Sequence, residues 1–209
     1  MTNESMYRVL SAYHEAGHAV VGHLIGRYIQ EISIVSGKGR YRGYCRFNAF
    51  VEDMNLHPEW HETSKNPELI TIYYAGMLAM AYICAVNEGI YEYLEGSEQS
   101  DLEKIDQLLL QIGSDEQQRS YLKDKRWKQA QQRLSDHWDA VNTIATCLLE
   151  QSSLTGGEAH RMIRKSIGET TSDWRVEVWN MQELNDVKKT TYKKAANHKQ
   201  KGRRLYNRP

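Results

Sequence analysis

The sequence contains few of the residues that build disulfide scaffolds or thiolate metal sites. Only three of its 209 residues are cysteines, Cys45, Cys84 and Cys147, and no two of them form a Cys-x-x-Cys pair. An odd number of widely spaced cysteines argues against both kinds of site and fits a reducing compartment. The N-terminus also lacks the basic-then-apolar layout of a secretory signal peptide. We therefore expect a cytoplasmic protein, with peripheral membrane association left open.

Other common signatures are missing as well. No Gly-x-x-x-x-Gly-Lys-Ser/Thr loop occurs, so we expect no ATP binding of that kind. No internal repeat is visible. With 40% hydrophobic and 26% charged residues, the sequence is not that of a disordered, collagen-like or multi-span membrane protein. Its length suits one folded domain, with or without appendages.

One stretch, 69–86, has no charged residue at all. Its 18 residues are at the lower limit for a membrane span. However, it contains Thr71, three tyrosines and Gly76, and no basic residue flanks it closely. We interpret the stretch as a buried helix.

The zero net charge of the chain conceals an asymmetry. Residues 187–209 carry nine of the 27 basic side chains and none of the 27 acidic ones. Residues 1–186 therefore have a net charge of −9. We predict a folded domain over 1–186 and a basic, flexible tail over 187–209. Such a tail can contact an acidic surface, for example an acidic protein, RNA or anionic lipid.

The apolar pattern predicts a mainly α-helical protein with a short β-hairpin. Apolar residues recur at spacings of three and four over 5–25, which indicates a helix, and Gly26 provides a C-terminal stop. Two apolar runs, 32–35 and 44–47, have glycines between them and predict the hairpin. Residues 51–67 are polar and are interpreted as a loop.

Two capping boxes predict where later helices begin. Ser100 with Glu103, and Thr155 with Glu158, have the Ser/Thr-x-x-Glu spacing of this motif. The first box predicts a helix that starts at Asp101. The remaining helices are expected over about 68–87, 115–134, 136–151 and 155–167.

The strongest chemical signal is a His-Glu-x-x-His motif on the first predicted helix, His14-Glu15-Ala16-Gly17-His18. Residues four apart lie one turn above each other, so both imidazoles can bind one metal ion. Zinc lowers the pKa of a bound water, and Glu15 is placed to take its proton before attack on a carbonyl. From the composition, about 0.03 such motifs are expected by chance in a chain of this length.

Two histidines leave zinc underligated, so a third protein ligand is needed. The extended metzincin pattern fails, because Leu24 stands where its third histidine would be. Glu88 and Asp101 are both candidates, and spacing does not choose between them. His57 and His61 are also four apart, but they lie in a proline-bearing loop and are interpreted as surface histidines.

The residues around the motif resemble the peptidase domain of the FtsH family of ATP-dependent zinc metalloproteases. Residues 12–22, Ala-Tyr-His-Glu-Ala-Gly-His-Ala-Val-Val-Gly, match the zinc helix of that family nearly residue for residue. Residues 32–44 resemble its strand pair, 96–103 its segment with an Asp-Leu-Glu helix start, and 141–158 its closing helices. The resemblance covers about residues 6–167.

This resemblance implies a specific site and activity. It implies Asp101, in place of Glu88, as the third zinc ligand beside His14 and His18. It also implies a mostly helical fold and endopeptidase activity on unfolded chains, with a zinc-bound water activated by Glu15. We therefore expect a zinc metallopeptidase whose substrates are unfolded or flexible polypeptides.

The sequence also departs from the family pattern. Residues 75–80, Ala-Gly-Met-Leu-Ala-Met, lack the Arg and Glu of the family's Ala-Gly-Arg-x-Ala-Glu signature. No segment resembles the family's ATPase motor or its membrane helices. We therefore expect a peptidase that takes flexible substrates by itself or works with an AAA unfoldase or an FtsH-family partner in trans. A homo-oligomer is also compatible with the sequence.

Three further hypotheses follow from the sequence. The chain could be a non-proteolytic regulatory or interaction module that keeps a structural zinc site, although the intact Glu15 argues against this. A weaker hypothesis is nucleic-acid binding through the tail. Finally, we expect the strand at 31–36 to be exposed and to align an extended peptide by strand addition.

Overall fold

The computed structural model describes residues 3–35, 43–47, 67–86 and 99–169, which belong to one compact unit. In this part of the chain, six helices accompany a three-stranded antiparallel sheet, of which the sequence predicts the helices and a two-stranded hairpin. The helices are α1 (Asn3–Leu24), α2 (Glu68–Val86), α3 (Gln99–Ile112), α4 (Glu116–Asp136), α5 (Trp138–Gln151) and α6 (Gly156–Ile167). The strands are β1 (Ile29–Ser33), β2 (Tyr44–Phe47) and β3 (Ser153–Thr155).

Several sequence predictions fall outside these residues. The proposed domain end at residue 186, the basic tail 187–209 and nearly all of the 51–67 loop are among them. So are three candidate or excluded ligands, Glu88, His57 and His61.

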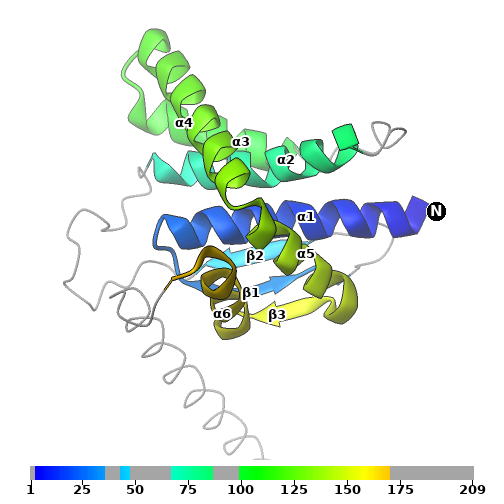
Figure 1. Ribbon diagram of the computed structural model, residues 1–209. Helices are drawn as coiled ribbons and strands as arrows, with labels where there is room; N and C mark the ends of the chain where they lie inside the picture. Colours follow the sequence, from blue (N-terminus) through cyan, green and yellow to red (C-terminus); the bar gives the residue numbers. More distant parts are fainter. Residues whose placement is uncertain (1–2, 36–42, 48–66, 87–98, 170–209) are drawn as a thin grey trace, which may run out of the picture. The chain divides into compact units, whose positions relative to one another are not determined.

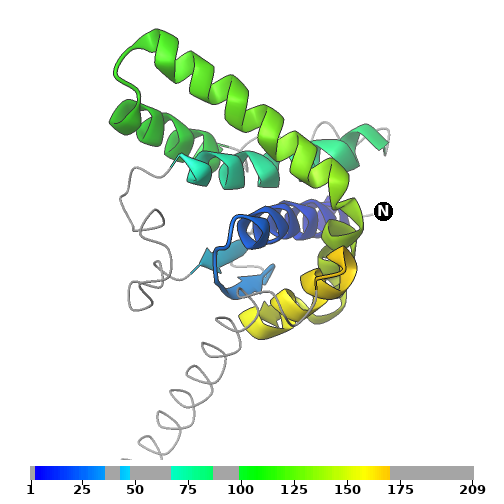
Figure 2. The same ribbon diagram turned by 60° about the vertical axis from the view of Figure 1, so that its left-hand side comes forward.

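Helix α1 lies between α2 and the sheet (Figures 1 and 2). Its buried side chains include Ala12, Ala16, Ala19 and Val20, which are all fully inaccessible to solvent. These side chains belong to the main hydrophobic core, so α1 is held on two sides. The helix ends where predicted, because Gly26 has a φ of +86° and its N–H bonds to the His23 carbonyl.

Helices α1 and α2 approach each other closely at Gly17. A Cβ added at this residue would lie 2.5 Å from the Ala75 backbone oxygen and 2.9 Å from the Ala79 Cβ. Glycine on one helix and alanine on the other therefore permit backbone contact, and this contact brings α2 directly over the histidine face of α1.

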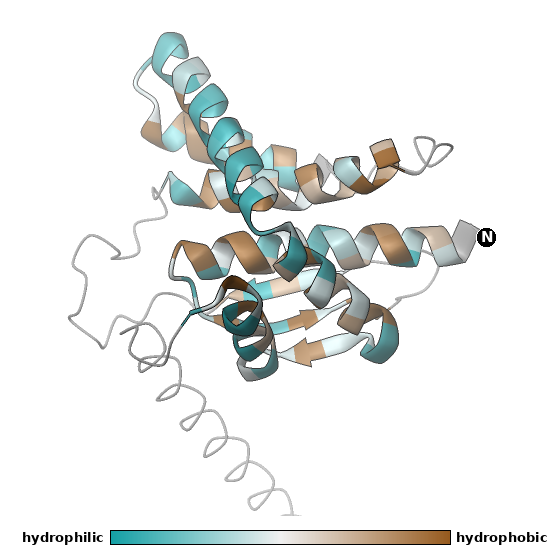
Figure 3. Cartoon of the chain, in the orientation of Figure 1, coloured by the Kyte–Doolittle hydropathy of each residue, from teal (hydrophilic) through white to brown (hydrophobic). Residues whose placement is uncertain are grey.

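Helix α2 contains the uncharged stretch 69–86, which the sequence predicts to be a buried helix. Among the described residues it is the only helix that is long and apolar enough to cross a membrane, and 56% of its 18-residue apolar window is buried inside the protein. Its buried residues include Ile70, Ala75 and Met80. Helix α4, in contrast, is largely hydrophilic (Figure 3).

Ion pairs attach α4 to the start of α2. Glu68, in the first turn of α2, accepts hydrogen bonds from Arg126 and, at 3.1 Å, from Arg133. Arg126 is buried and also donates to Gln129 at 2.8 Å. These contacts are partly desolvated, and they hold the first turn of α2 against α4.

The sheet has the order β2-β1-β3. Strands β1 and β2 pair antiparallel with Ile32 opposite Cys45, so the predicted hairpin partners are confirmed. The third strand was not predicted: Leu154 pairs with Ile32 on the other side of β1. The expectation of an exposed strand at 31–36 is therefore wrong. Strand β1 is central, and both Ile32 and Ile34 are buried in the core.

The two capping boxes have different outcomes. Thr155 caps α6 as predicted: its side chain accepts from the Glu158 N–H, while Glu158 accepts from the Thr155 N–H at 2.8 Å. The prediction that Ser100 caps α3 is wrong, because α3 begins at Gln99 and Ser100 lies inside its first turn. Asp101 nevertheless lies in the first turn of α3, as predicted.

A second histidine pair ties α1 to α6 and β1. The Ile29 N–H donates to His160 Nε2 (3.0 Å), and His160 Nδ1 lies 2.8 Å from His23 Nδ1. His23 Nε2 is 3.2 Å from a carboxylate oxygen of Glu169. One tautomer assignment satisfies all three contacts with both rings neutral. Burial above all, together with the positive charge of Arg164, holds the pKa of His160 well below its usual value.

Candidate metal centre

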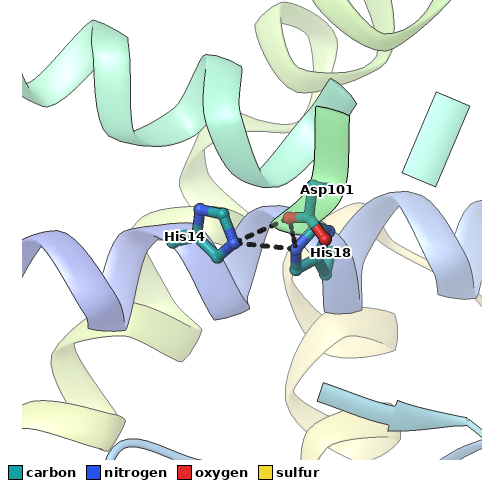
Figure 4. A group of neighbouring side chains, drawn as sticks. All are labelled: His14, His18 and Asp101. Atoms are coloured by element: carbon teal, nitrogen blue, oxygen red, sulfur yellow. Dashed lines mark hydrogen bonds and ion pairs between the residues drawn. The ribbon is translucent and has the colours of Figure 1, made fainter. Parts of the chain in front are cut away.

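Three side chains predicted as metal ligands meet at the contact of α1, α2 and α3. His14 and His18 lie on the same face of α1, and Asp101 reaches them from the first turn of α3 (Figure 4). The Asp101 Oδ2 atom is 3.0 Å from the Nε2 atom of each histidine, and the two Nε2 atoms are 2.9 Å apart. They form a buried group that could hold a metal ion.

The contacts of the group are compatible with a bound cation. His18 Nδ1 lies 2.8 Å from the Ile72 carbonyl oxygen, so this nitrogen carries the proton of the neutral ring. Its Nε2 lone pair then faces the Asp101 carboxylate, which is also an acceptor. His14 Nδ1 is buried with no hydrogen-bond partner in the described part of the chain. A cation between His14 Nε2, His18 Nε2 and Asp101 Oδ2 would bind all three atoms.

The ligand types suit a divalent transition metal ion. Two imidazole nitrogens and one carboxylate oxygen are a typical catalytic zinc set, which leaves one position open. Separations of 2.9–3.0 Å allow one ion to bind all three atoms, with bonds of about 2.0–2.2 Å. The second ring nitrogen of His18 is fixed by a backbone carbonyl, as is common for ligating histidines.

The electrostatics keep the carboxylate ionised. Burial works to raise the pKa of Asp101, but hydrogen bonds and charge attraction from His14 and His18 outweigh it, and the pKa is well below its usual value. Burial works to lower the pKa of His18, yet its hydrogen bond to Asp101 raises the pKa overall. The Asp101 carboxylate therefore stays ionised across the physiological pH range.

Gly76 of α2 forms the wall behind the imidazoles. A Cβ at this position would lie 2.5 Å from both Nε2 and Cε1 of His18, and 3.0 Å from Cε1 of His14. Any other residue would occupy the space of the two ligands. Sequence reasoning missed this role, although Gly76 stands in the Ala-Gly pair that the resemblance had already singled out.

Glu15 lies next to the ligands and is buried, with 5% of its surface exposed. Its side chain packs directly on Gly43, where a Cβ would come within 2.5 Å of Oε1. Burial raises the pKa of Glu15, against the positive charge of His14 and His18, which lowers it. A raised pKa suits a carboxylate that must take up and release a proton near neutral pH.

The second oxygen of Asp101 contacts a different partner. Lys104, one turn along α3, donates to Asp101 Oδ1 at 2.9 Å. Its ammonium also lies 5.1 Å from the centroid of the Tyr73 ring, and Tyr73 meets the His18 ring edge-on at 6.4 Å. Neither Lys104 nor Tyr73 was singled out from the sequence, because a single lysine or tyrosine on a helix carries no recognisable signal.

Comparison with known proteins does not assign the chain to a family. No protein-family model matches the chain, and no curated protein matches it. The function of the protein is therefore inferred from the site and from the sequence that forms it.

A bound metal should stabilise the fold strongly. Zinc at about a thousand times its dissociation constant should add about 4 kcal/mol to the free energy of unfolding. For a chain of this size, this raises Tm by on the order of 10 °C. The measurement is thermal unfolding with zinc and with a chelator. His137→Ala, outside the site, should keep the shift, and Asp101→Asn should lose most of it. Equal shifts in both variants would contradict a site at Asp101.

Proposed function

We propose that this protein is a zinc-dependent endopeptidase that hydrolyses unfolded or flexible polypeptides without a motor of its own. The observation that carries the proposal is the buried Glu15 carboxyl beside a His14–His18–Asp101 group. A structural zinc site needs ligands but no adjacent base. The resemblance of residues 12–22 to the FtsH zinc helix supports the same reaction.

The side chains can divide the chemistry between them. A bound zinc ion would lower the pKa of water and polarise the scissile carbonyl. His14, His18 and Asp101 would hold that ion, and Asp101 would offset part of its charge. Glu15 would accept a proton from the attacking water and deliver it to the leaving amine nitrogen. Its contact with Gly43 would keep the carboxyl aimed at the site.

Strand β2 is the better candidate for aligning a substrate. Strand β1 has neighbours on both edges, whereas β2 pairs only with β1 in the part of the chain that the structure describes. Gly43, immediately before β2, contacts Glu15. An extended polypeptide added along the outer edge of β2 would therefore pass close to the proposed base.

One observation favours the second candidate function, a non-proteolytic regulatory module with a structural zinc. Met77 and Met80 stand where the FtsH signature has its Arg and Glu, and both are buried. The protein has thus replaced charged contacts of the family with apolar packing. Regulation would then depend on a partner such as an FtsH-family protein or an AAA unfoldase.

The two candidates differ in a direct assay. An unfolded, fluorescently labelled protein is incubated with the full chain and zinc, without ATP. The peptidase should release fragments, and a chelator should stop their release. Zinc-loaded protein that releases no fragments from any unfolded substrate would overturn the proposal in favour of the regulatory module.

A further inference from the structure

The two oxygens of Asp101 have different partners. Oδ2 points to both histidine Nε2 atoms at 3.0 Å, whereas Oδ1 accepts a hydrogen bond from the Lys104 ammonium at 2.9 Å. Carboxylates can bind metals through one oxygen or through both. In this structure the second oxygen is already occupied by a cation of the chain itself.

The position of Lys104 is built into the fold. It lies three residues after Asp101, so the two side chains share one face of the first turn of α3. On its other side the ammonium faces the Tyr73 ring of α2 at 5.1 Å. The ammonium is thus held between a carboxylate and an aromatic ring from two different helices.

This ion pair differs from the other lysine pairs near α3. The Lys104 side chain is 48% exposed, but that of Asp101 is only 5% exposed, so the charge of the carboxylate is poorly screened by water. In the pair of Lys123 with Asp106, also 2.9 Å long, the two side chains are 50% and 61% exposed. Exposed pairs of that kind contribute little to structure. The contact at Asp101 therefore has an orienting effect that the surface pair lacks.

We propose that Lys104 is a positioning residue that restricts Asp101 to a single-oxygen contact with the metal. The inference rests on the proposed function, because the site must hold zinc and Glu15 must deprotonate its water, whereas the single-oxygen contact itself requires only the zinc. A free Oδ1 would compete with water for the open position of the ion. By occupying Oδ1, Lys104 preserves that position for the water that Glu15 must deprotonate.

The test compares zinc-loaded crystal structures and solution measurements of the wild type, Lys104→Met, Lys104→Arg and the matched control Lys123→Met. In the wild type, one oxygen of Asp101 should lie at bonding distance from zinc, about 2.0–2.2 Å. In Lys104→Met both oxygens should bind. Zinc affinity should stay within about tenfold, while hydrolysis of the unfolded substrate should fall about 10- to 100-fold. Lys104→Arg should restore the single contact, and Lys123→Met should match the wild type.

The outcomes separate this inference from the proposed function. Two-oxygen binding already in the wild type, or single-oxygen binding in Lys104→Met with unchanged hydrolysis, would overturn the role of Lys104 while the zinc site stands. A wild type that binds no zinc would overturn both. Tyr73→Leu provides a second variant, which leaves Lys104 in place but removes its aromatic contact. It should give mixed one- and two-oxygen binding, and full wild-type behaviour would contradict the role of the Tyr73 ring in holding Lys104.

Discussion

Replacing Glu15 by glutamine should lower the rate of peptide hydrolysis by about 10²- to 10⁴-fold. Glutamine has the same shape as glutamate, so it fits against Gly43, where space is limiting. It cannot accept a proton from the attacking water, however, so the reaction loses its base. Zinc affinity, measured by competition with a chromogenic chelator, should change by only a few-fold, because all three ligands remain.

The control for this experiment is Glu116→Gln. Glu116 lies on α4 with its side chain 88% exposed, so the same chemical change there should leave hydrolysis unaltered. If Glu15→Gln retained more than about a tenth of the wild-type rate, Glu15 would not be the general base. Loss of zinc from Glu15→Gln would instead mean that the residue supports the ligands.

Replacing Gly76 by alanine should abolish tight zinc binding, with a loss in affinity on the order of 100-fold or more. The new methyl group would take the space of the His18 Nε2 and Cε1 atoms. An imidazole is the far end of a flexible side chain, so it can rotate away without moving the backbone. The fold should therefore survive, and alanine even favours the helix by about 1 kcal/mol. Zinc titration and circular dichroism measure the two effects separately.

Gly17→Ala is the matched comparison, since it places the same methyl group on the facing helix. That group would meet the Ala75 backbone oxygen, which cannot rotate away. Overpacking of this kind costs about 1–3 kcal/mol, which lowers Tm by about 2–4 °C for each kcal/mol. Gly76→Ala should thus lose zinc with little change in the Tm of the metal-free protein, and Gly17→Ala should lose stability. Wild-type zinc binding by Gly76→Ala would show that the wall is not needed.

The helices and the histidine ligands could be predicted because their signals are local. Spacings of three and four placed α1 correctly, and the same periodicity put His14 and His18 on one face. Asp101 is different, because spacing alone left it equal to Glu88. The resemblance to a known family was needed to prefer it, and the structure then brings it to both imidazoles.

The parts that could not be predicted depend on contacts between distant segments. Strand β3 is only three residues long, and Ser-Leu-Thr has no pattern of its own; its partner β1 lies more than a hundred residues earlier. Without β3, the sequence made β1 look like an edge strand. The role of Gly76 against the imidazoles could not be predicted either, because a glycine inside an apolar helix reveals a close contact only when the opposing side chains are known.

The metal ligands come from two helices, α1 and α3, that are far apart in the sequence but in contact at the site. His18 and Asp101 are 83 residues apart in sequence, so a metal bound to both would act as a covalent-like cross-link and close a long loop. By analogy with disulfides, fixing such a loop removes conformational entropy from the unfolded chain, worth up to about 4 kcal/mol. A protein without a disulfide framework would thereby gain a reversible cross-link between two helices of its core.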